Sequence, residues 1–229
     1  MNGLIVQLRE FQRERESQIE LEDSFERLAK YLLYRGYFKC SERYDFYITS
    51  IEFYYHEENG VIKDPIVYHR NRRKWNKKSQ MVLHETKPYF EIGTINLHMS
   101  GIDITFERSG KYRASALIRA FRVYDKQDNL WLDEDDRSTY VYEYLFDGLN
   151  VDKTLTQLDW MEIDNAEPEH LPSTIRKNVF HYVHSEAEAL REGIDIEKMK
   201  VYDCDFFKTD KLCERKWRYS RKDSRFCKS

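Results

Sequence analysis

A single glutamate interrupts an aromatic, strand-like segment of this chain, in the sequence SIEFYY at residues 50–55. Glu52 lies between Ile51 and Phe53, and Tyr54 follows two positions later. A carboxylate on such a strand either faces solvent or points inward among rings, where desolvation raises the pKa of a carboxyl group and makes it a usable general base. On spacing alone the solvent-facing orientation is the more frequent outcome. In either orientation Glu52 and Tyr54 share one face, because alternate residues of a strand point to the same side.

The segment GTINLHMSG at residues 93–101 carries polar side chains along one strand face. Asn96, His98 and Ser100 alternate there with apolar residues, a pattern that is hard to explain as an ordinary surface. His69 lies elsewhere, directly before a basic run. A lone histidine is more often a packing residue than a ligand or a catalyst. No short-range spacing links either histidine to further metal ligands, so the sequence does not support a metal site.

Arg119 interrupts a second apolar segment, ALIRAF at residues 116–121. A buried guanidinium needs a partner, because leaving its charge unpaired costs several kcal/mol. Glu52 and Asp103 are the available carboxylates. The alternative is an arginine on an edge strand that faces water.

Positive charge is concentrated in two places, although the formal net charge of the chain is only −3. Six arginines and lysines lie between His69 and residue 79 with no acidic residue among them, and the C-terminal tail is also basic. This distribution fits a basic face for phosphate, although charge clusters alone are more often solvated loops. The candidate nucleic-acid-binding residues are Arg70, Arg72, Arg73, Lys74, Trp75, Lys77, Lys216 and Arg218.

Apolar spacing predicts an amphipathic helix that ends at Gly36. The charged lead over residues 1–18 is expected to be flexible or a frayed helix. Aromatic and β-branched residues predict a strand over 44–55, and a long loop, functional or mobile, is expected from 56 to 80.

An antiparallel meander is expected next, because short glycine turns leave no room for crossover helices. Its strands are predicted at about 90–98, 101–107 and 114–124. The remaining elements are expected as helices over 138–149, 151–162 and 185–193 and as strands over 174–184 and 216–226. Together these elements predict one α+β domain over residues 1–229.

The composition is that of a soluble protein, with 34% charged residues and a mean hydropathy of −0.81. No apolar run is long enough to span a bilayer, and the N-terminus lacks the apolar centre of a secretory signal. We therefore expect a cytoplasmic protein with no membrane partner. The cysteines form no CxxC pair, so reduced thiols are expected. They are Cys40, Cys204, Cys213 and Cys227.

Taken in order, these motifs resemble the alkyladenine (3-methylpurine) DNA glycosylase family. The resemblance rests on LAKYLLYRGYF, SIEFYY, GTINLHMSG, ALIRAF and GLNVDKTLTQLDW, and it spans about residues 26–165. RKWRYS is similar to the closing strand of the family. The resemblance implies an α+β domain with a curved antiparallel sheet flanked by helices. It also implies a monofunctional base-excision repair enzyme that uses no metal or other cofactor.

The resemblance assigns roles to the matching positions. Glu52 would activate the attacking water, and Arg119 would help hold that water and pair with the glutamate. Tyr54 would stack on the flipped base, with His69 on its other side or at its sugar and phosphate. His98 would replace a second stacking aromatic. One carboxylate is enough to catalyse the hydrolytic release of an alkylated purine, because that base is already a cationic leaving group.

Several positions depart from the family pattern. Ser100 stands where the intercalating tyrosine is expected, and the serine side chain is too small to insert between the bases of a duplex. Asn96 and His98 replace aromatic residues and make the pocket more polar. Glu107 falls near the asparagine expected to discriminate purines. A single-stranded substrate, a different modified base, or a wedge supplied by Trp75 would accommodate these changes.

The sequence therefore predicts a DNA glycosylase, acting as a monomer on damaged or modified DNA, duplex or single-stranded. Two alternatives remain open: a non-catalytic nucleic-acid-binding module on the same scaffold, and a hydrolase of free nucleosides. An inward-facing Glu52 within reach of Arg119 would favour the enzyme. Glu52 exposed to open solvent would leave a binding protein.

Overall fold

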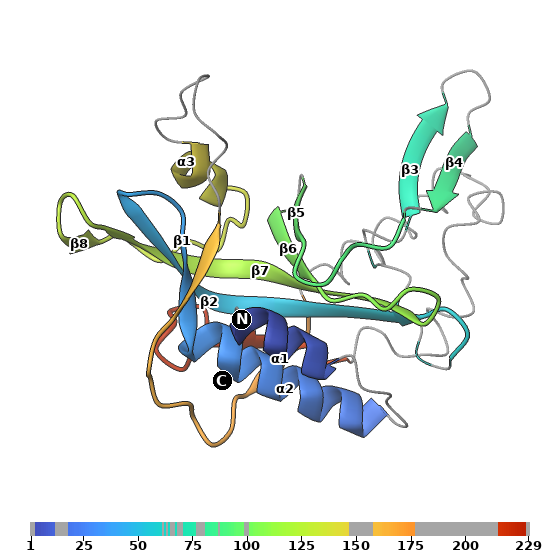
Figure 1. Ribbon diagram of the computed structural model, residues 1–229, viewed down its shortest axis with the longest axis horizontal. Helices are drawn as coiled ribbons and strands as arrows, with labels where there is room; N and C mark the ends of the chain where they lie inside the picture. The colour runs from blue at the N-terminus through green and yellow to red at the C-terminus, as the bar shows by residue number, and fades with distance from the viewer. Residues whose placement is uncertain are drawn as a thin grey trace, which may run out of the picture.

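Two helices cover one side of a curved β-sheet in the computed structural model (Figure 1). They are α1 (Gly3–Phe11) and α2 (Gln18–Tyr34), and they lie against the long strands β2 (Tyr44–Glu57) and β7 (Tyr112–Asp125). The short helix α3 (Val141–Phe146) lies on the opposite side. The structure describes residues 3–11, 18–60, 62, 64, 67, 71–76, 81–86, 88–98, 101–146, 158–176 and 215–227, with the backbone alone at 18, 71–76, 81–86 and 145–146.

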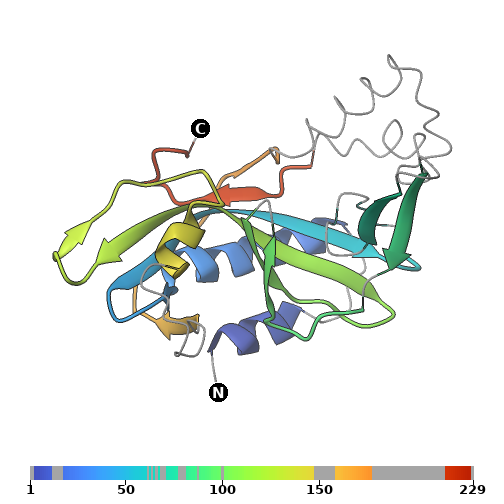
Figure 2. The same cartoon turned by 90° about the horizontal axis from the view of Figure 1, so that it is seen from above.

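Nine strands of the described chain form one antiparallel sheet. Its main path runs β10–β11–β2–β7–β6–β5, while β1 joins β2 to β9 and β8 pairs with β7. Figure 2 shows the C-terminal strand β11 beside β2. The other strands are β1 (Gly36–Lys39), β5 (Ile95–His98), β6 (Gly101–Thr105), β8 (Leu130–Trp131), β9 (Asp159–Glu162), β10 (Ser173–Thr174) and β11 (Arg218–Ser220).

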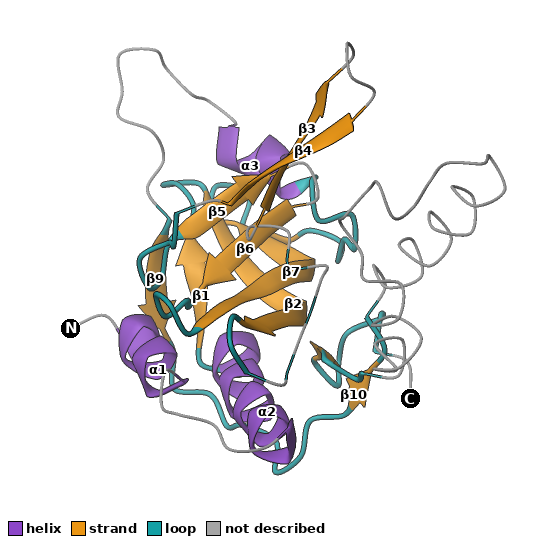
Figure 3. Cartoon of the chain, turned by 90° about the vertical axis from the view of Figure 1, so that its right-hand side faces the viewer, coloured by secondary structure: helices purple, strands orange, loops and turns teal. Residues whose placement is uncertain are grey.

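The sheet is strongly curved, and β5 and β6 rise from β7 on the side away from α1 and α2 (Figure 3). The expected meander of β5, β6 and β7 is confirmed, because each neighbouring pair is antiparallel. The α+β class, with a curved antiparallel sheet and flanking helices, is likewise confirmed.

Aromatic rings attach the two helices to the sheet. Phe25 of α2 stacks on Phe53 of β2 with ring centroids 4.5 Å apart, and Phe11 of α1 meets Phe106 edge-on at 4.6 Å. All four rings are at most 3% exposed. Burial of each such side chain stabilises the fold by about 1.5–3 kcal/mol. The apolar stripe of α2, predicted from the sequence, is therefore the surface that fixes one face of β2.

Part of the basic run, residues 71–76, lies on a strand, where the sequence predicts a loop. β3 (Asn71–Asn76) pairs antiparallel with β4 (Met81–Thr86) as a separate hairpin. The expectation of a loop from 56 to 80 is therefore wrong for 71–76. The dense positive charge obscured the strand, and its pairing partner, the apolar sequence MVLHET, lies beyond the run.

The other predictions of helices and strands are confirmed only in part. Residues 3–11 form a packed helix, not a flexible lead, because Leu4 and Leu8 enter the core together with Phe11. α3 lies within the helix predicted over 138–149. Residues 159–162 form strand β9, paired with β1, where the sequence predicts the end of a helix. The predicted helix over 185–193 lies outside the described residues.

The described cysteines are free thiols, as the sequence predicts. Cys40 is buried and Cys227 is partly exposed. Burial raises the pKa of Cys40 to about 12, and the charge of Asp45 adds to this effect. Cys204 and Cys213 lie outside the described residues.

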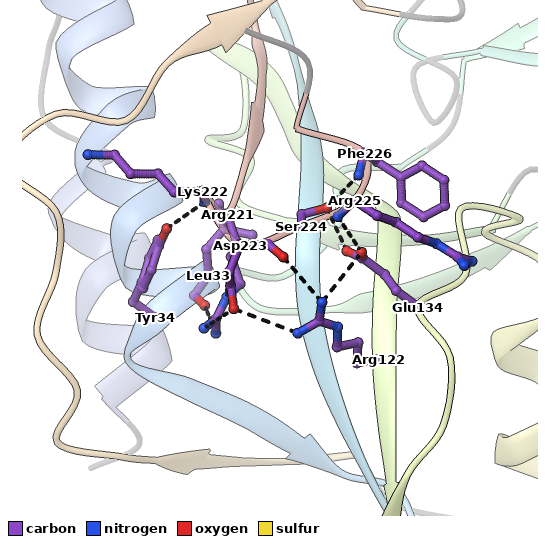
Figure 4. A network of polar contacts seen from close by, with 10 residues as sticks. All are labelled: Leu33, Tyr34, Arg122, Glu134, Arg221, Lys222, Asp223, Ser224, Arg225 and Phe226. Atoms are coloured by element: carbon purple, nitrogen blue, oxygen red, sulfur yellow. Dashed lines mark hydrogen bonds and ion pairs between the residues drawn. The ribbon is translucent and has the colours of Figure 1, made fainter.

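Buried polar contacts tie the C-terminal segment to the sheet and to α2 (Figure 4). Glu134 accepts a hydrogen bond from Ser224 Oγ at 2.6 Å and another from the Arg225 amide at 2.8 Å. Arg221 Nη1 donates to the Leu33 carbonyl oxygen, near the end of α2, at 3.1 Å. These contacts secure the segment that directly follows β11.

We predict that Glu134→Gln destabilises the protein. Glutamine loses the charge and one of the acceptor oxygens that the buried carboxylate offers, and an unsatisfied buried donor costs about 1–3 kcal/mol. Urea denaturation should show this loss in the free energy of unfolding. The neighbouring Asp133 is exposed, so Asp133→Asn should change it by less than about 0.5 kcal/mol. Equal effects of the two substitutions would contradict the prediction.

Candidate functional site

Strand β2 presents two chemically different faces. Ile51, Phe53 and Tyr55 join the hydrophobic core, whereas Tyr54 is buried outside it. Glu52 lies on the Tyr54 face and is 0% exposed. The solvent-facing orientation that spacing alone favours is therefore wrong, because the face opposite the helices is buried as well.

Residues from several strands form a row on this second face. The register aligns Arg218 of β11 with Glu52, and Glu52 with Leu117 of β7. It continues from Leu117 to Asp103 of β6, and from there to Asn96 of β5. Residues paired across neighbouring strands point to the same face. Leu117, in the middle, is 2% exposed and lies outside the hydrophobic core.

Glu52 is held by two donors. Arg119 Nε lies 2.7 Å from Glu52 Oε2, and the Tyr54 hydroxyl donates to the same oxygen at 3.0 Å. The guanidinium stabilises negative charge on the carboxylate. Burial raises the pKa of Tyr54, and the charge of Glu52 raises it further. The tyrosine therefore keeps its proton and remains a donor to Glu52.

Arg119 reaches Glu52 from an irregular point of β7. The β2–β7 register shifts between Ile48 and Ile51, and it skips Arg119. Irregularities of this kind re-aim a side chain. Burial acts to lower the pKa of Arg119, but the charges and hydrogen bonds of Glu52 and Tyr54 together outweigh it, and the net pKa lies above its ordinary value. Arg119 Nη2 is buried and has no hydrogen-bond partner in the described part of the chain.

Arg218 adds positive charge beside Glu52. It is 8% exposed, and its Nε donates to Ser50 Oγ at 3.2 Å. Burial lowers the pKa of Arg218 and the charge of Arg119 lowers it further, although Glu52 opposes both. The residue that the sequence places on a nucleic-acid-binding surface is thus buried next to the carboxylate. Lys216, from the same predicted set, is exposed.

A second buried ion pair lies beside Tyr54. Arg176 Nη1 is 2.6 Å from Asp64 Oδ2, and both side chains are 0% exposed. The Arg176 guanidinium lies 4.9 Å from the ring centroid of Tyr54 and 4.9 Å from that of Trp217. The pair therefore restrains the ring whose hydroxyl holds Glu52.

An imidazole and a carboxylate meet toward the other end of the row. His98 Nε2 lies 3.0 Å from Asp103 Oδ2, with the side chains 7% and 3% exposed. Ser115 Oγ donates to the other carboxylate oxygen at 3.3 Å. The Tyr142 hydroxyl of α3 donates to the His98 carbonyl oxygen at 2.6 Å. Asn96 Nδ2 is buried with no hydrogen-bond partner among the residues that the structure describes.

Glu107 belongs to a separate structural ion pair. Its Oε2 accepts from the Phe90 amide at 2.6 Å and from Arg113 Nη1 at 3.2 Å. The Arg113 guanidinium also lies 3.6 Å from the Tyr89 ring centroid. These contacts account for the carboxylate at the position that the resemblance associates with purine discrimination.

The structure gathers part of the predicted site. The predicted residues on the second face are Glu52, Tyr54, Asn96, His98, Arg119 and Arg218. Residues of the site that sequence analysis missed are Asp64, Ser115 and Arg176, which have no distinctive local sequence signal. His69, Arg70, Lys77 and Ser100 lie outside the described residues, and Arg72, Arg73, Lys74 and Trp75 are described by their backbone alone.

No protein-family model matches the sequence, and neither a curated protein nor a solved structure is significantly similar to it. Among the described helices, none is long and apolar enough to cross a membrane.

We predict that Asp64→Asn lowers the free energy of unfolding by about 3–5 kcal/mol, because it leaves the Arg176 charge buried without its carboxylate. Thermal or urea denaturation measures this loss. Asp164→Asn is the matched control, because Asp164 is paired with Arg35 but its side chain is 100% exposed. Its expected cost is below about 1 kcal/mol. Similar losses of unfolding free energy in the two variants would contradict the prediction, because they would show that burial of the ion pair does not determine its contribution to stability.

Proposed function

We propose that this protein is a DNA glycosylase that hydrolyses the N-glycosidic bond of a modified base, with Glu52 activating the water. The observation that supports this proposal most directly is the carboxylate of Glu52, which is fully buried and is held by Arg119 and Tyr54 on the sheet face away from the core. A buried charge is costly even when paired, and such groups concentrate at functional sites. The ordered motifs that resemble alkyladenine DNA glycosylases support the same reaction and a glycosylase-like fold.

In the proposed reaction, Glu52 accepts a proton from water as the water oxygen bonds to C1′ of the deoxyribose. The bond between C1′ and the base nitrogen breaks, and its electron pair leaves with the base. The carboxylate also stabilises the positive charge that develops on the sugar. Arg119 holds Glu52 through Nε, and its Nη2 remains as a donor to the water.

Tyr54 and the Arg176–Asp64 pair keep the general base in place. Tyr54 donates to Glu52 Oε2, and the guanidinium of Arg176 lies over the Tyr54 ring. A positioned base requires a rigid support, because small displacements of the reacting groups reduce the rate strongly. We propose that this support lets Glu52 serve one defined water position.

The basic hairpin is the proposed contact for the DNA backbone. The β3 sequence carries Arg72, Arg73 and Lys74, and the hairpin projects from one end of the sheet (Figure 1). Positive charge of this kind binds phosphate without reading sequence. Exposed Lys216, near β11, is a second candidate contact.

The decisive prediction concerns Glu52→Gln. The substitution keeps an acceptor for Arg119 and Tyr54 but removes the proton acceptor, so base release should fall by about 100-fold or more. DNA binding should change by less than about twofold. Base release is measured on alkylated, deaminated and otherwise modified oligonucleotides, and binding by fluorescence anisotropy.

Glu42→Gln is the matched control, because the Glu42 side chain is 94% exposed on the β1–β2 hairpin. It should release bases at the wild-type rate, and circular dichroism should show that both variants are folded. If the wild-type protein releases no base from any of these substrates, the glycosylase proposal fails. Activity on free nucleosides without activity on oligonucleotides would favour the nucleoside hydrolase.

A further prediction tests the binding of phosphate by the hairpin. The double variant Arg72→Gln/Lys74→Gln should weaken DNA binding regardless of sequence. The slope of the logarithm of the binding constant against the logarithm of salt concentration should become shallower, by about one unit for each phosphate that the variant no longer neutralises. Binding is measured across a series of salt concentrations. Lys39→Gln/Lys222→Gln removes the same charge far from the hairpin and should leave the slope unchanged. An unchanged slope in the first variant would exclude β3 from the interface.

A further inference from the structure

A group of large apolar side chains lies on the surface at one end of the sheet. This aromatic patch consists of Tyr37 of β1, Tyr47 of β2, Tyr124 of β7, Trp131 of β8 and Met161 of β9. Trp131 is 54% exposed and Met161 is 39% exposed, while the three tyrosines are partly exposed. Single exposed apolar residues are common, but a contiguous group of them marks a site of interaction.

The rings of the aromatic patch contact one another across neighbouring strands. Tyr37 stacks on Tyr47 with ring centroids 4.7 Å apart, and Trp131 meets Tyr47 edge-on at 4.8 Å. Tyr124 lies 5.2 Å from Trp131, and Met161 is paired with Tyr37 in the strand register. The strands therefore hold these side chains in place before anything binds. Such an ordered surface loses little conformational entropy on binding.

The composition and the position of the aromatic patch fit a protein partner. Tyrosine, tryptophan and methionine are enriched in protein–protein interfaces, and the first two are frequent hot spots. The patch includes β8 at one end of the sheet, whereas the basic hairpin of β3 and β4 projects from the other end (Figures 1 and 2). The proposed contact with DNA therefore leaves the patch free.

The basic side chains beside the aromatic patch are neutralised by carboxylates. Arg43 lies 2.7 Å from Asp125 and 3.1 Å from Asp128, so one cation serves two acids. Lys126 lies 2.8 Å from Asp45. The other two such cations, with their carboxylates, are Lys39 with Glu42, and Arg122 with Glu134 and Asp223.

Two further carboxylates leave the edge of the aromatic patch with an excess of negative charge. Asp159 comes two residues before Met161 on β9, and Asp133 comes two residues after Trp131. Both are exposed, and neither forms an ion pair with a residue that the structure describes. Phosphates of a nucleic acid would be repelled by these carboxylates, whereas a basic segment would be attracted.

We infer that the aromatic patch binds a partner protein through an arginine-containing segment. A guanidinium stacks on the faces of tryptophan and tyrosine rings, and it also pairs with carboxylates. Trp131 and Tyr47 supply the rings, while Asp133 and Asp159 supply the charge. The inference does not depend on the proposed glycosylase function, because the patch contains none of the residues that hold Glu52.

The test measures the binding of a fluorescein-labelled nona-arginine peptide to the full chain by fluorescence anisotropy. Trp131→Ala should weaken binding by about tenfold, because it removes the most exposed ring of the patch. Tyr140→Ala is the matched control. Tyr140 is also an exposed ring next to an arginine, but it lies outside the patch, so its substitution should change binding by less than about twofold.

The wild-type protein allows a second comparison that does not require Trp131→Ala to fold. Nona-lysine has the same charge as nona-arginine but stacks less well on aromatic rings, so it should bind at least about threefold more weakly. Equal affinity for the two peptides would show attraction by charge alone and overturn the inference.

The contribution of the unpaired carboxylates is tested by Asp133→Asn/Asp159→Asn. This variant should weaken the binding of nona-arginine by about threefold or more, because the partner loses two opposite charges. Glu10→Gln/Asp23→Asn removes the same charge from exposed positions of α1 and α2 and should leave binding unchanged. Equal effects of the two double variants would contradict a specific role for the edge of the patch.

Three further outcomes would overturn the inference. The first is that the wild-type protein does not bind nona-arginine, and the second is that a 15-residue oligothymidylate requires Trp131 for binding, which would make the patch a surface for stacking bases. The third is self-association of the wild-type protein that Trp131→Ala abolishes, measured by analytical ultracentrifugation, because the patch would then bind a second copy of this chain.

Discussion

The ion pair between Glu52 and Arg119 is the constraint on which the rest of the site depends. The Glu52 side chain is 0% exposed and that of Arg119 10%, and removal of either partner from such a pair costs about 3–5 kcal/mol. The surrounding backbone must therefore bring the two side chains together. The irregular register of β2 and β7 does so at the point where the pairing skips Arg119.

The fold can accommodate the cost of this buried ion pair because the opposite face of β2 is held in the hydrophobic core. Phe53 stacks on Phe25 of α2, and the neighbouring Ile51 and Tyr55 join the same core. This apolar burial stabilises the strand, so the opposite face can carry polar groups that by themselves would oppose folding. One strand thus supplies the core and the site, with alternate residues assigned to each.

The site is completed by segments that are distant in sequence. β11 places Arg218 opposite Glu52, and Arg176 pairs with Asp64 beside Tyr54. Glu134 and Ser224 anchor the residues that follow β11. The C-terminal segment is therefore part of the construction of the site, because it supplies one edge of the sheet next to the proposed general base.

The parts of the fold that depend on local pattern were predictable. The apolar stripe of α2, the aromatic strand β2 and the meander of β5 to β7 follow from residue spacing and glycine turns, since those signals act over a few residues. The hairpin of β3 and β4 was missed, because a run of positive charge conceals a strand whose partner lies beyond it. Strand β9 was missed for a related reason, since its pairing with β1 overrides its local helical pattern.

The sequence by itself determined that Glu52, Tyr54, His98 and Arg119 are unusual, because each is a polar or charged group in an apolar or alternating segment. Only the tertiary structure decided their orientation. Spacing alone favours a solvent-exposed Glu52, and burial of the second face reverses that outcome. Long-range pairing also decided which charges meet, since the register across four strands, not proximity in the chain, brings Arg218, Glu52 and Asp103 into one row.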